Sequence, residues 1–158
     1  MRNLPAVWTN RFAALVNVFT SFGFFDDPSD DARVIAEFSR VLEPGGVFVW
    51  HGASRDGVMS RFLSRDWWET ADGTIVMQER SFDALSGVLG IESTIRRKTG
   101  RTTRRKHRIR LYTATRLAEL CAREGLIVEE AFDGFSSRPL TRRSTEMLLV
   151  ARKQSGTE

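Results

Sequence analysis

The sequence is poor in the residues from which disulfide frameworks and metal centres are built. Its 158 residues include one cysteine and two histidines. A single cysteine cannot form a disulfide within the chain, and Cys121 lies on the apolar side of a predicted helix, so we interpret it as a small buried hydrophobic residue. The two histidines are far apart in the sequence, and the chain therefore offers little from which to build a metal site.

Long hydrophobic runs are also missing. No apolar stretch approaches the ~18 residues that a membrane-spanning helix requires, and the N-terminus has no apolar core of the kind found in signal peptides. These absences predict a cytoplasmic protein without a membrane partner. The remaining composition, 41% hydrophobic and 28% charged, is ordinary for a globular protein.

The charge is unevenly distributed along the chain. The formal net charge is +4, and residues 96–110 contain nine lysines or arginines and no acidic residue. The rest of the chain holds 15 basic and 20 acidic residues. A chain of this length is expected to fold as one domain that buries roughly two-thirds of its unfolded surface, so the basicity belongs to one element of that domain.

Residues 12–27, FAALVNVFTSFGFFDD, form the stretch around which the chain is organised. Its nearly continuous apolar run is typical of a parallel strand covered on both faces. Asn17 interrupts the run near its end, and four phenylalanines follow around Gly23. Because ligands of open α/β sheets bind outside the carboxyl ends of the strands, the loop after Asn17 is either a ligand-binding loop or a packed aromatic turn.

The next residues complete a βαβ unit. Asp27 and Pro28 are a capping residue and a first-turn proline, and the apolar residues from Val34 to Leu42 recur at helical spacing. A Pro-Gly-Gly turn ends this helix, and residues 47–51, VFVWH, form a second short strand. The pattern predicts two parallel strands joined by a right-handed crossover.

These motifs resemble those of a known family. FAALVNVFTSFGFFDD followed by RVLEPGGVFVW resembles the fourth strand, the following helix and the fifth strand of S-adenosylmethionine-dependent methyltransferases of the Rossmann-like class. The similarity is greatest to a small-molecule subgroup that carries FDAVxNxFTSFGYF and RVLxPGG. IRLYTATRLAELCAREGL (residues 109–126) and EMLLVARK (residues 146–153) resemble the RLYT segment and the last strand of that subgroup.

The resemblance covers the C-terminal part of the family domain. No segment matches the acidic glycine-rich turn that holds the methionine end and the ribose of the cofactor in the family, and Ala13 stands where the family has Asp. The start MRNLP resembles a stretch that follows the adenine-contacting Asp. We therefore interpret residues 1–158 as a single methyltransferase-like domain that is incomplete at its N-terminus.

Residues 74–112 are predicted to form an inserted antiparallel β segment. A helix is predicted over residues 55–68, and strands over residues 74–82, 88–97 and 103–112, joined by hairpin turns. A loop at residues 99–101 would place Leu89 opposite Leu111, Ile91 opposite Ile109, and Glu92 opposite Arg108.

The C-terminal part returns to α/β form. Thr113 caps a predicted helix that Gly125 ends, and strands are predicted over residues 127–132 and 145–151. In the family topology these are the sixth and seventh strands of a sheet with the order 4-5-7-6, and the seventh is antiparallel. The predicted fold class is α/β, a partial Rossmann-like methyltransferase sheet with the inserted hairpin layer.

The resemblance implies methyl transfer from S-adenosylmethionine, the expected cofactor, to a small-molecule acceptor. An activated methyl donor needs mainly proximity and alignment, so no catalytic side chain is assigned. By the family's motif, the cofactor contacts would be Met1, Arg2, Asn17, Val18 and Phe19. Residues bordering the substrate would be Phe22, His51, Arg110 and Tyr112. His51 would orient the substrate or accept its proton, or else be a hydrogen-bonded structural histidine, and Phe22 has core packing as its alternative.

Two other functions are open at the level of sequence. The basic segment 96–110 would neutralise phosphates in a nucleic-acid-binding module, but the scarcity of aromatic residues there favours a solvated outer strand instead. A non-catalytic methyltransferase-like subunit is the other alternative. Without the cofactor-binding strand, residues 12–19 become an apolar edge, which predicts self-association or pairing with a partner strand there, and weak or no cofactor binding by the isolated chain.

Overall fold

The computed structural model describes residues 3–155, and it divides into two compact units. The first comprises the residues up to Ser60 and those from Tyr112 onward, and the second is Arg61–Leu111. The architecture is α/β with two four-stranded sheets, as predicted for the fold class. No helix of the described residues is both long and apolar enough to cross a lipid bilayer.

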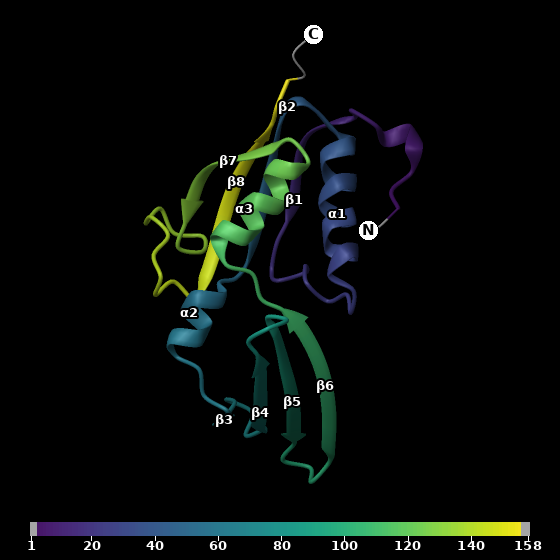
Figure 1. Cartoon of the computed structure of the whole chain (residues 1–158). Coiled ribbons are helices and arrows are strands. Elements are labelled where there is room, and N and C mark those ends of the chain that lie inside the picture. The colour runs from purple at the N-terminus through teal and green to yellow at the C-terminus, as the bar shows by residue number, and fades with distance from the viewer. Residues whose placement is uncertain (1–2, 156–158) are drawn as a thin grey trace. The chain divides into compact units, whose positions relative to one another are not determined.

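The sheet of the first unit is mixed (Figure 1). Its strands, in spatial order, are β1 (Phe12–Asn17), β2 (Leu42–Ala53), β8 (Glu146–Lys153) and β7 (Leu126–Phe132). β1 and β2 are parallel, and β8 is antiparallel to both of its neighbours. Within residues 3–155, β1 pairs with β2 alone and is an edge strand.

Two capped helices cover this sheet, and a 3₁₀ turn, η1 (Ala6–Trp8), precedes it. Helix α1 (Pro28–Val41) begins as predicted, because the Asp27 side chain accepts a hydrogen bond of 2.8 Å from the Ser29 backbone nitrogen. Helix α3 (Ala114–Arg123) has Thr113 as its cap, which accepts from the Arg116 backbone nitrogen at 3.1 Å. The helices contact each other and lie in front of the sheet in Figure 1.

The core of the first unit lies between these helices and one face of the sheet. Its largest fully buried side chains come from helices α1 and α3 and from strands β2, β7 and β8. They are Phe48, Ile35, Leu42, Leu117, Leu126 and Met147. Cys121 is buried there as predicted, and burial raises the pKa of its thiol to about 12. The prediction that the strand of residues 12–19 is covered on both faces is wrong, because Val16, on the other face of β1, is 62% exposed.

The predicted helix over residues 55–68 is shorter in the structure. Helix α2 is Arg55–Ser60, and β3 (Arg65–Glu69) follows it. Trp67 and Trp68 pair with Met77 and Val76 of β4 (Ile75–Asp83). Aromatic residues favour strands when a neighbouring strand is there to pair with them, and this tertiary pairing overrides the weaker helical spacing.

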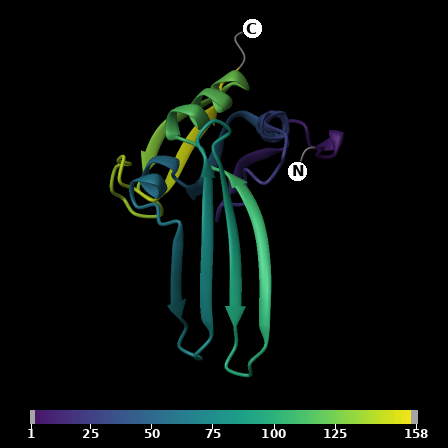
Figure 2. The same cartoon turned by 60° about the horizontal axis from the view of Figure 1, so that its bottom comes forward.

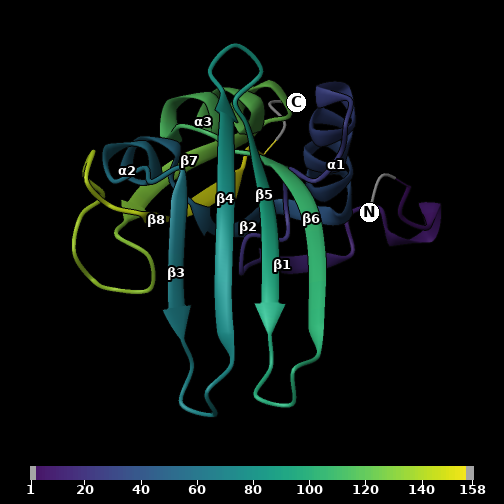
Figure 3. The same cartoon turned by 90° about the horizontal axis from the view of Figure 1, so that it is seen from below.

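The sheet of the second unit is fully antiparallel. Its order is β3, β4, β5 (Val88–Arg96) and β6 (Thr102–Arg110), with the β3–β4 and β5–β6 turns at one end (Figures 2 and 3). The strands begin within two residues of their predicted starts. The second unit nevertheless begins before residue 74, where the inserted segment was predicted to start, because β3 belongs to its sheet.

The predicted register of the β5–β6 hairpin is wrong by two residues. Leu89 lies opposite Ile109, and Glu92 opposite Lys106. The Arg97 backbone nitrogen donates to the Arg101 carbonyl at 2.9 Å, so the three-residue loop comprises residues 98–100. Gly100 takes φ +81° as its last residue, and a left-handed final residue is what such a loop requires. The shift is even, so each side chain keeps its predicted face.

Candidate functional site

The backbone turns sharply where β1 ends. Asn17 is 5% exposed, and the two residues after Val18 adopt left-handed conformations, with φ 58° at Phe19 and 55° at Thr20. Two consecutive non-glycine residues with positive φ are uncommon, and each costs of the order of 1–3 kcal/mol unless surrounding contacts hold it. The predicted cofactor-binding residues Asn17, Val18 and Phe19 therefore lie at the start of a strained loop at the carboxyl end of β1.

His51, near the end of the neighbouring strand β2, holds this loop at two points. Its Nδ1 accepts a hydrogen bond from the Phe19 backbone nitrogen at 3.2 Å. Its backbone carbonyl accepts one from the Thr20 nitrogen at 3.3 Å. Asn17 pairs with Trp50 in the parallel ladder, so His51, the next residue of β2, lies level with the start of the loop after β1.

The tautomer of His51 follows from its partners. A backbone N–H can only donate, so Nδ1 carries the lone pair, and the proton of the neutral ring is on Nε2. Nε2 lies 3.4 Å from Oε2 of Glu146, the first residue of β8. Both ring nitrogens thus face protein partners, and the buried ring, 3% exposed, presents no vacant nitrogen to a substrate.

Two aromatic rings flank the histidine. Phe135 stacks on it with ring centroids 4.0 Å apart, and Phe19 meets it edge-on at 5.9 Å. These two phenyl rings are largely exposed, at 61% for Phe135 and 75% for Phe19. The Glu146 side chain is 60% exposed beside them. Exposed aromatic faces next to a carboxylate attract cations, so this edge of the sheet is suited to a positively charged ligand.

Phe22 and Tyr112, two predicted substrate residues, lie in the core of the same unit. The Tyr112 hydroxyl donates a 2.6 Å hydrogen bond to Oδ2 of Asp31, which is fully buried in helix α1. Phe22 packs 5.5 Å from the Tyr112 ring and edge-on to Trp50 at 6.4 Å. These contacts with the core stabilise the loop after β1. A contact of Phe22 or Tyr112 with substrate stays a prediction.

The remaining three predicted residues do not belong to the described part of the first unit. Arg110 belongs to the second unit, where it ends β6 opposite Val88. Met1 and Arg2 lie outside the described residues. Sequence reasoning missed Glu146 and Phe135. Glu146 carried a signal, because the first residue of an antiparallel last strand lies level with the carboxyl end of its neighbour, and Ala53 pairs with it.

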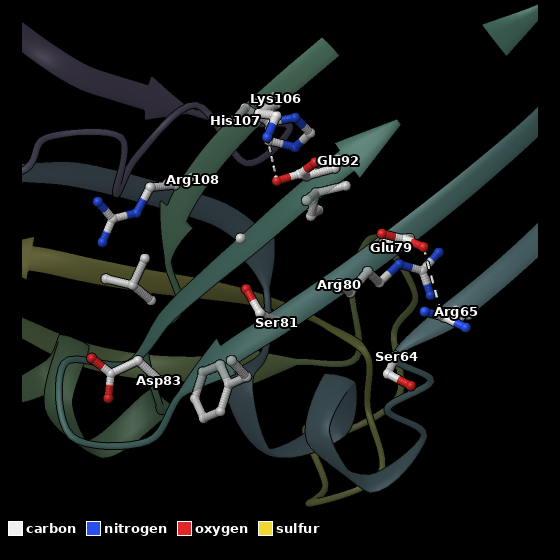
Figure 4. Close-up of a pocket in the computed structure, with 14 residues that line it drawn as sticks. Ser64, Arg65, Glu79, Arg80, Ser81, Asp83, Glu92, Lys106, His107 and Arg108 are labelled. Atoms are coloured by element: carbon white, nitrogen blue, oxygen red, sulfur yellow. Dashed lines mark hydrogen bonds and ion pairs between the residues drawn. The ribbon is translucent and has the colours of Figure 1, made fainter. Parts of the chain in front are cut away.

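A second candidate site is a hollow on the sheet of the second unit (Figure 4). It has a volume of about 820 Å³, and its floor includes Gly90, where a Cβ would lie 2.8 Å from Oγ of Ser81. Ion pairs cross its rim on both sides, Lys106 with Glu92 at 2.6 Å and Arg65 with Glu79 at 3.4 Å. Most of the charge lining the hollow is therefore compensated within the sheet.

The β5–β6 hairpin, parts of which line the hollow, also carries charge outside the hollow that is not compensated. Lys106 pairs with Glu92. By contrast, six of the nine cations in residues 96–110 make no side-chain hydrogen bond or ion pair with any residue of the described range 3–155. These six are Arg96, Arg97, Lys98, Arg101, Arg104 and Arg105. Such a surface attracts anions over distances of the order of a Debye length, about 8 Å at physiological salt.

Comparison with known proteins bears on the fold. No family model and no curated protein sequence matches the chain. Among solved structures, the CcbJ methyltransferase from Streptomyces caelestis matches with a TM-score of 0.81 and 19% identity over 92% of this chain. An S-adenosylmethionine-dependent methyltransferase from Clostridium acetobutylicum matches with a TM-score of 0.81 and 15% identity over 98% of this chain.

A third match is CalS10 from Micromonospora echinaspora, an amino pentose methyltransferase solved with S-adenosylmethionine bound. Its TM-score is 0.69, with 17% identity over 96% of this chain. This chain covers 59%, 62% and 62% of these three structures, so it spans about three-fifths of their length. At such identities the matches show that the chain has the Rossmann-like α/β fold of S-adenosylmethionine-dependent methyltransferases.

Proposed function

We propose that this chain takes part in the transfer of a methyl group from S-adenosylmethionine to a small-molecule acceptor. The observation that carries the proposal is the strained loop after β1, with Phe19 and Thr20 in left-handed conformations and anchored to His51. Strained backbone that surrounding contacts hold in place is typical of functional sites. Ligands of open α/β sheets bind outside the carboxyl ends of strands, where this loop lies.

The residues present fit the chemistry of the cofactor. S-adenosylmethionine is a sulfonium cation, and it supplies an activated methyl group when bound. The exposed rings of Phe19 and Phe135 and the carboxylate of Glu146 form a surface that favours a cation. Asn17, Val18 and Phe19 would hold the methionine side of the cofactor, and Met1 and Arg2 its adenine side.

The chain's own contribution is to bind and to orient. No residue is assigned to attack the methyl group, because alignment of donor and acceptor supplies most of the rate acceleration in such transfers. The aromatic rings beside His51 would also exclude water from the reacting groups. His51 itself has both ring nitrogens engaged, so we do not assign it as the base that accepts a substrate proton.

An amine is the acceptor that this surface favours. Glu146 and the two exposed phenyl rings would attract an amine in its protonated form, which would release a proton to solvent before its nitrogen lone pair attacks the methyl group. Two of the matching structures are an amino pentose methyltransferase and the sugar N-methyltransferase KedS8, which has a TM-score of 0.58 and 22% identity. We therefore propose small amine-bearing molecules as the first acceptors to try.

Cofactor binding to the purified chain tests this proposal. We expect weak binding of S-adenosylmethionine by ligand-detected NMR, because the matching enzymes contain further chain that this sequence does not cover. Phe19→Ala should remove the binding signal. Phe24→Ala is the matched control, since Phe24 is also exposed, at 52%, but has no ring contact with His51 in the described structure. Absence of any signal from the unmodified chain would contradict the proposal and favour a non-catalytic methyltransferase-like subunit.

A second candidate function is the binding of a polyanion by the β5–β6 hairpin. The observation in its favour is the six cations that have no side-chain partner among the described residues, since Lys and Arg side chains on one element neutralise phosphates when a nucleic acid binds. Arg104→Glu with Arg105→Glu should abolish salt-dependent binding to a single-stranded oligonucleotide. Arg33→Glu with Arg116→Glu changes the net charge equally and should not. Equal losses in both double variants would show a nonspecific charge effect and exclude this function.

A further inference from the structure

We infer that His51 is a positioning residue that sets the conformation of the loop after β1 through its neutral Nε2–H tautomer. The inference deepens the proposed function and rests on it, because the loop matters to catalysis only if it holds the cofactor. It assigns His51 a role that differs from contact with the substrate or proton transfer. The role is to offer a hydrogen-bond acceptor, Nδ1, to the backbone N–H of Phe19 in the loop.

The loop needs such an acceptor because its backbone is strained. Phe19 and Thr20 are left-handed and lie beyond Asn17–Trp50, the last pair of the β1–β2 ladder, and the Phe19 N–H donates to the His51 ring of β2. The turn also contains a 2.9 Å hydrogen bond from the Ser21 hydroxyl to the Val18 carbonyl, and the Phe19 ring lies 5.7 Å from the Phe135 ring. Without His51 the Phe19 N–H would lose its partner, and the loop would relax toward the ordinary right-handed or extended regions.

The tautomer is determined from both sides of the ring. The Phe19 N–H requires a lone pair on Nδ1, and the Glu146 carboxylate, which only accepts, favours the proton on Nε2. Stacking with Phe135 holds the ring plane between these partners. A histidine ring held by two hydrogen-bond partners and a stacked ring is pre-organised, as a residue that positions a binding loop should be.

Protonation would break this arrangement. A proton on Nδ1 turns the acceptor into a donor that faces the Phe19 N–H, so the hydrogen bond is lost and the loop is released. The groups that face the ring are the Glu146 carboxylate from β8, the Phe19 ring from the loop after β1, and the Phe135 ring from the segment before β8. These contacts fit the Nε2–H tautomer, in which the hydrogen bond to Phe19 is kept.

The first arm of the test reads the tautomer in the whole 158-residue chain. Long-range ¹H–¹⁵N NMR of the histidine rings distinguishes protonated from unprotonated nitrogens, and the chain has two histidines to assign. We expect a pure Nε2–H form for His51 near neutral pH. His107, whose side chain is exposed on β6, serves as the internal control and should show both tautomers, because no hydrogen bond within residues 3–155 holds its ring. An Nδ1–H form at His51 would overturn the inference.

The second arm reads the loop by amide hydrogen exchange. His51→Leu removes the acceptor, and the Phe19 amide should exchange roughly tenfold faster, which corresponds to the loss of one hydrogen bond. The Leu15 amide, within β1, reports whether the fold itself has changed and should keep its rate. His51→Asn places an amide oxygen close to the position of Nδ1, and it should restore most of the protection. Unchanged exchange at Phe19 in His51→Leu would overturn the inference.

The two arms separate this inference from the proposed function. Both are carried out without cofactor, so they decide the role of His51 even if the chain binds no S-adenosylmethionine. Where the unmodified chain does bind, His51→Leu should weaken binding about tenfold, and His51→Asn should recover it with the loop. If the His51→Leu variant bound S-adenosylmethionine as tightly as the unmodified chain, the positioning role would be excluded. If neither the unmodified chain nor any variant bound it, the proposed function would be contradicted, and the role of His51 would still be decided by the two arms.

Discussion

Among single residues, Tyr112 shows how a motif residue can serve the fold. Its hydroxyl donates to Asp31, whose carboxylate is fully buried in the first turn of helix α1. Tyr112→Phe keeps the ring and removes the donor, so a buried carboxylate loses a partner. We expect the free energy of unfolding to fall by about 1–3 kcal/mol, measured by urea denaturation.

The control for this prediction changes the other partner. Asp31→Asn keeps an acceptor for the tyrosine hydroxyl, and we expect it to cost less stability than Tyr112→Phe. If Tyr112→Phe left stability unchanged and weakened substrate binding instead, the substrate contact predicted from the RLYT motif would be the better account.

Part of the candidate site at the carboxyl ends of β1 and β2 could be predicted from the sequence. Asn17 and His51 stand where apolar strands end, and such positions face ligands in α/β sheets. The bond between the histidine ring and the Phe19 backbone could not be anticipated, because it depends on left-handed backbone at Phe19 and Thr20. Neither residue type favours that conformation, so the sequence carries no local sign of it.

At the scale of elements, the short helix α2 depends on a close approach to the chain before β8. Gly57 is buried, and a Cβ there would overlap the backbone carbonyl of Ser144 and lie 2.7 Å from the Thr145 nitrogen. An alanine ordinarily favours a helix over glycine by about 1 kcal/mol. Here we expect Gly57→Ala to destabilise the protein by about 2 kcal/mol, because the three atoms that the Cβ would meet are all backbone and cannot move aside.

Asp56→Ala is the matched control for the Gly57 substitution. It places the same side chain one residue earlier in α2, on an exposed position, and should change stability little. Thermal unfolding of both variants measures the difference. Equal stability of Gly57→Ala and the unmodified chain would mean that α2 does not pack against Ser144 in solution.

Element boundaries were predictable wherever local chemistry decides them. The caps Asp27 and Thr113 placed the starts of α1 and α3 correctly. The register of the β5–β6 hairpin could not be predicted in this way, because Gly100 could occupy either the middle or the end of a three-residue loop. β3 was missed for a related reason: its identity as a strand comes from its partner β4 and leaves little trace in its own spacing.

At the scale of the whole molecule, self-association depends on the open edge of β1. This strand has one neighbour among the described residues, and Val16 on its uncovered face is 62% exposed. An apolar edge with unpaired backbone groups is a template for another strand. A second copy offers the same edge, and two such edges pair antiparallel around a two-fold axis, which closes the assembly as a dimer.

We therefore predict concentration-dependent dimerisation of the purified chain through β1, measured by sedimentation velocity. Val16→Lys adds a charge on the exposed face next to the edge, the device by which natural edge strands avoid pairing, and should shift the equilibrium toward monomer at least tenfold. Leu85→Lys makes the same kind of change at a residue 98% exposed in the β4–β5 turn and should leave the equilibrium unchanged. A chain that stays monomeric at every concentration would show that the β1 edge does not recruit a second copy. Dimers equally sensitive to both substitutions would show that they form through overall charge and not through β1.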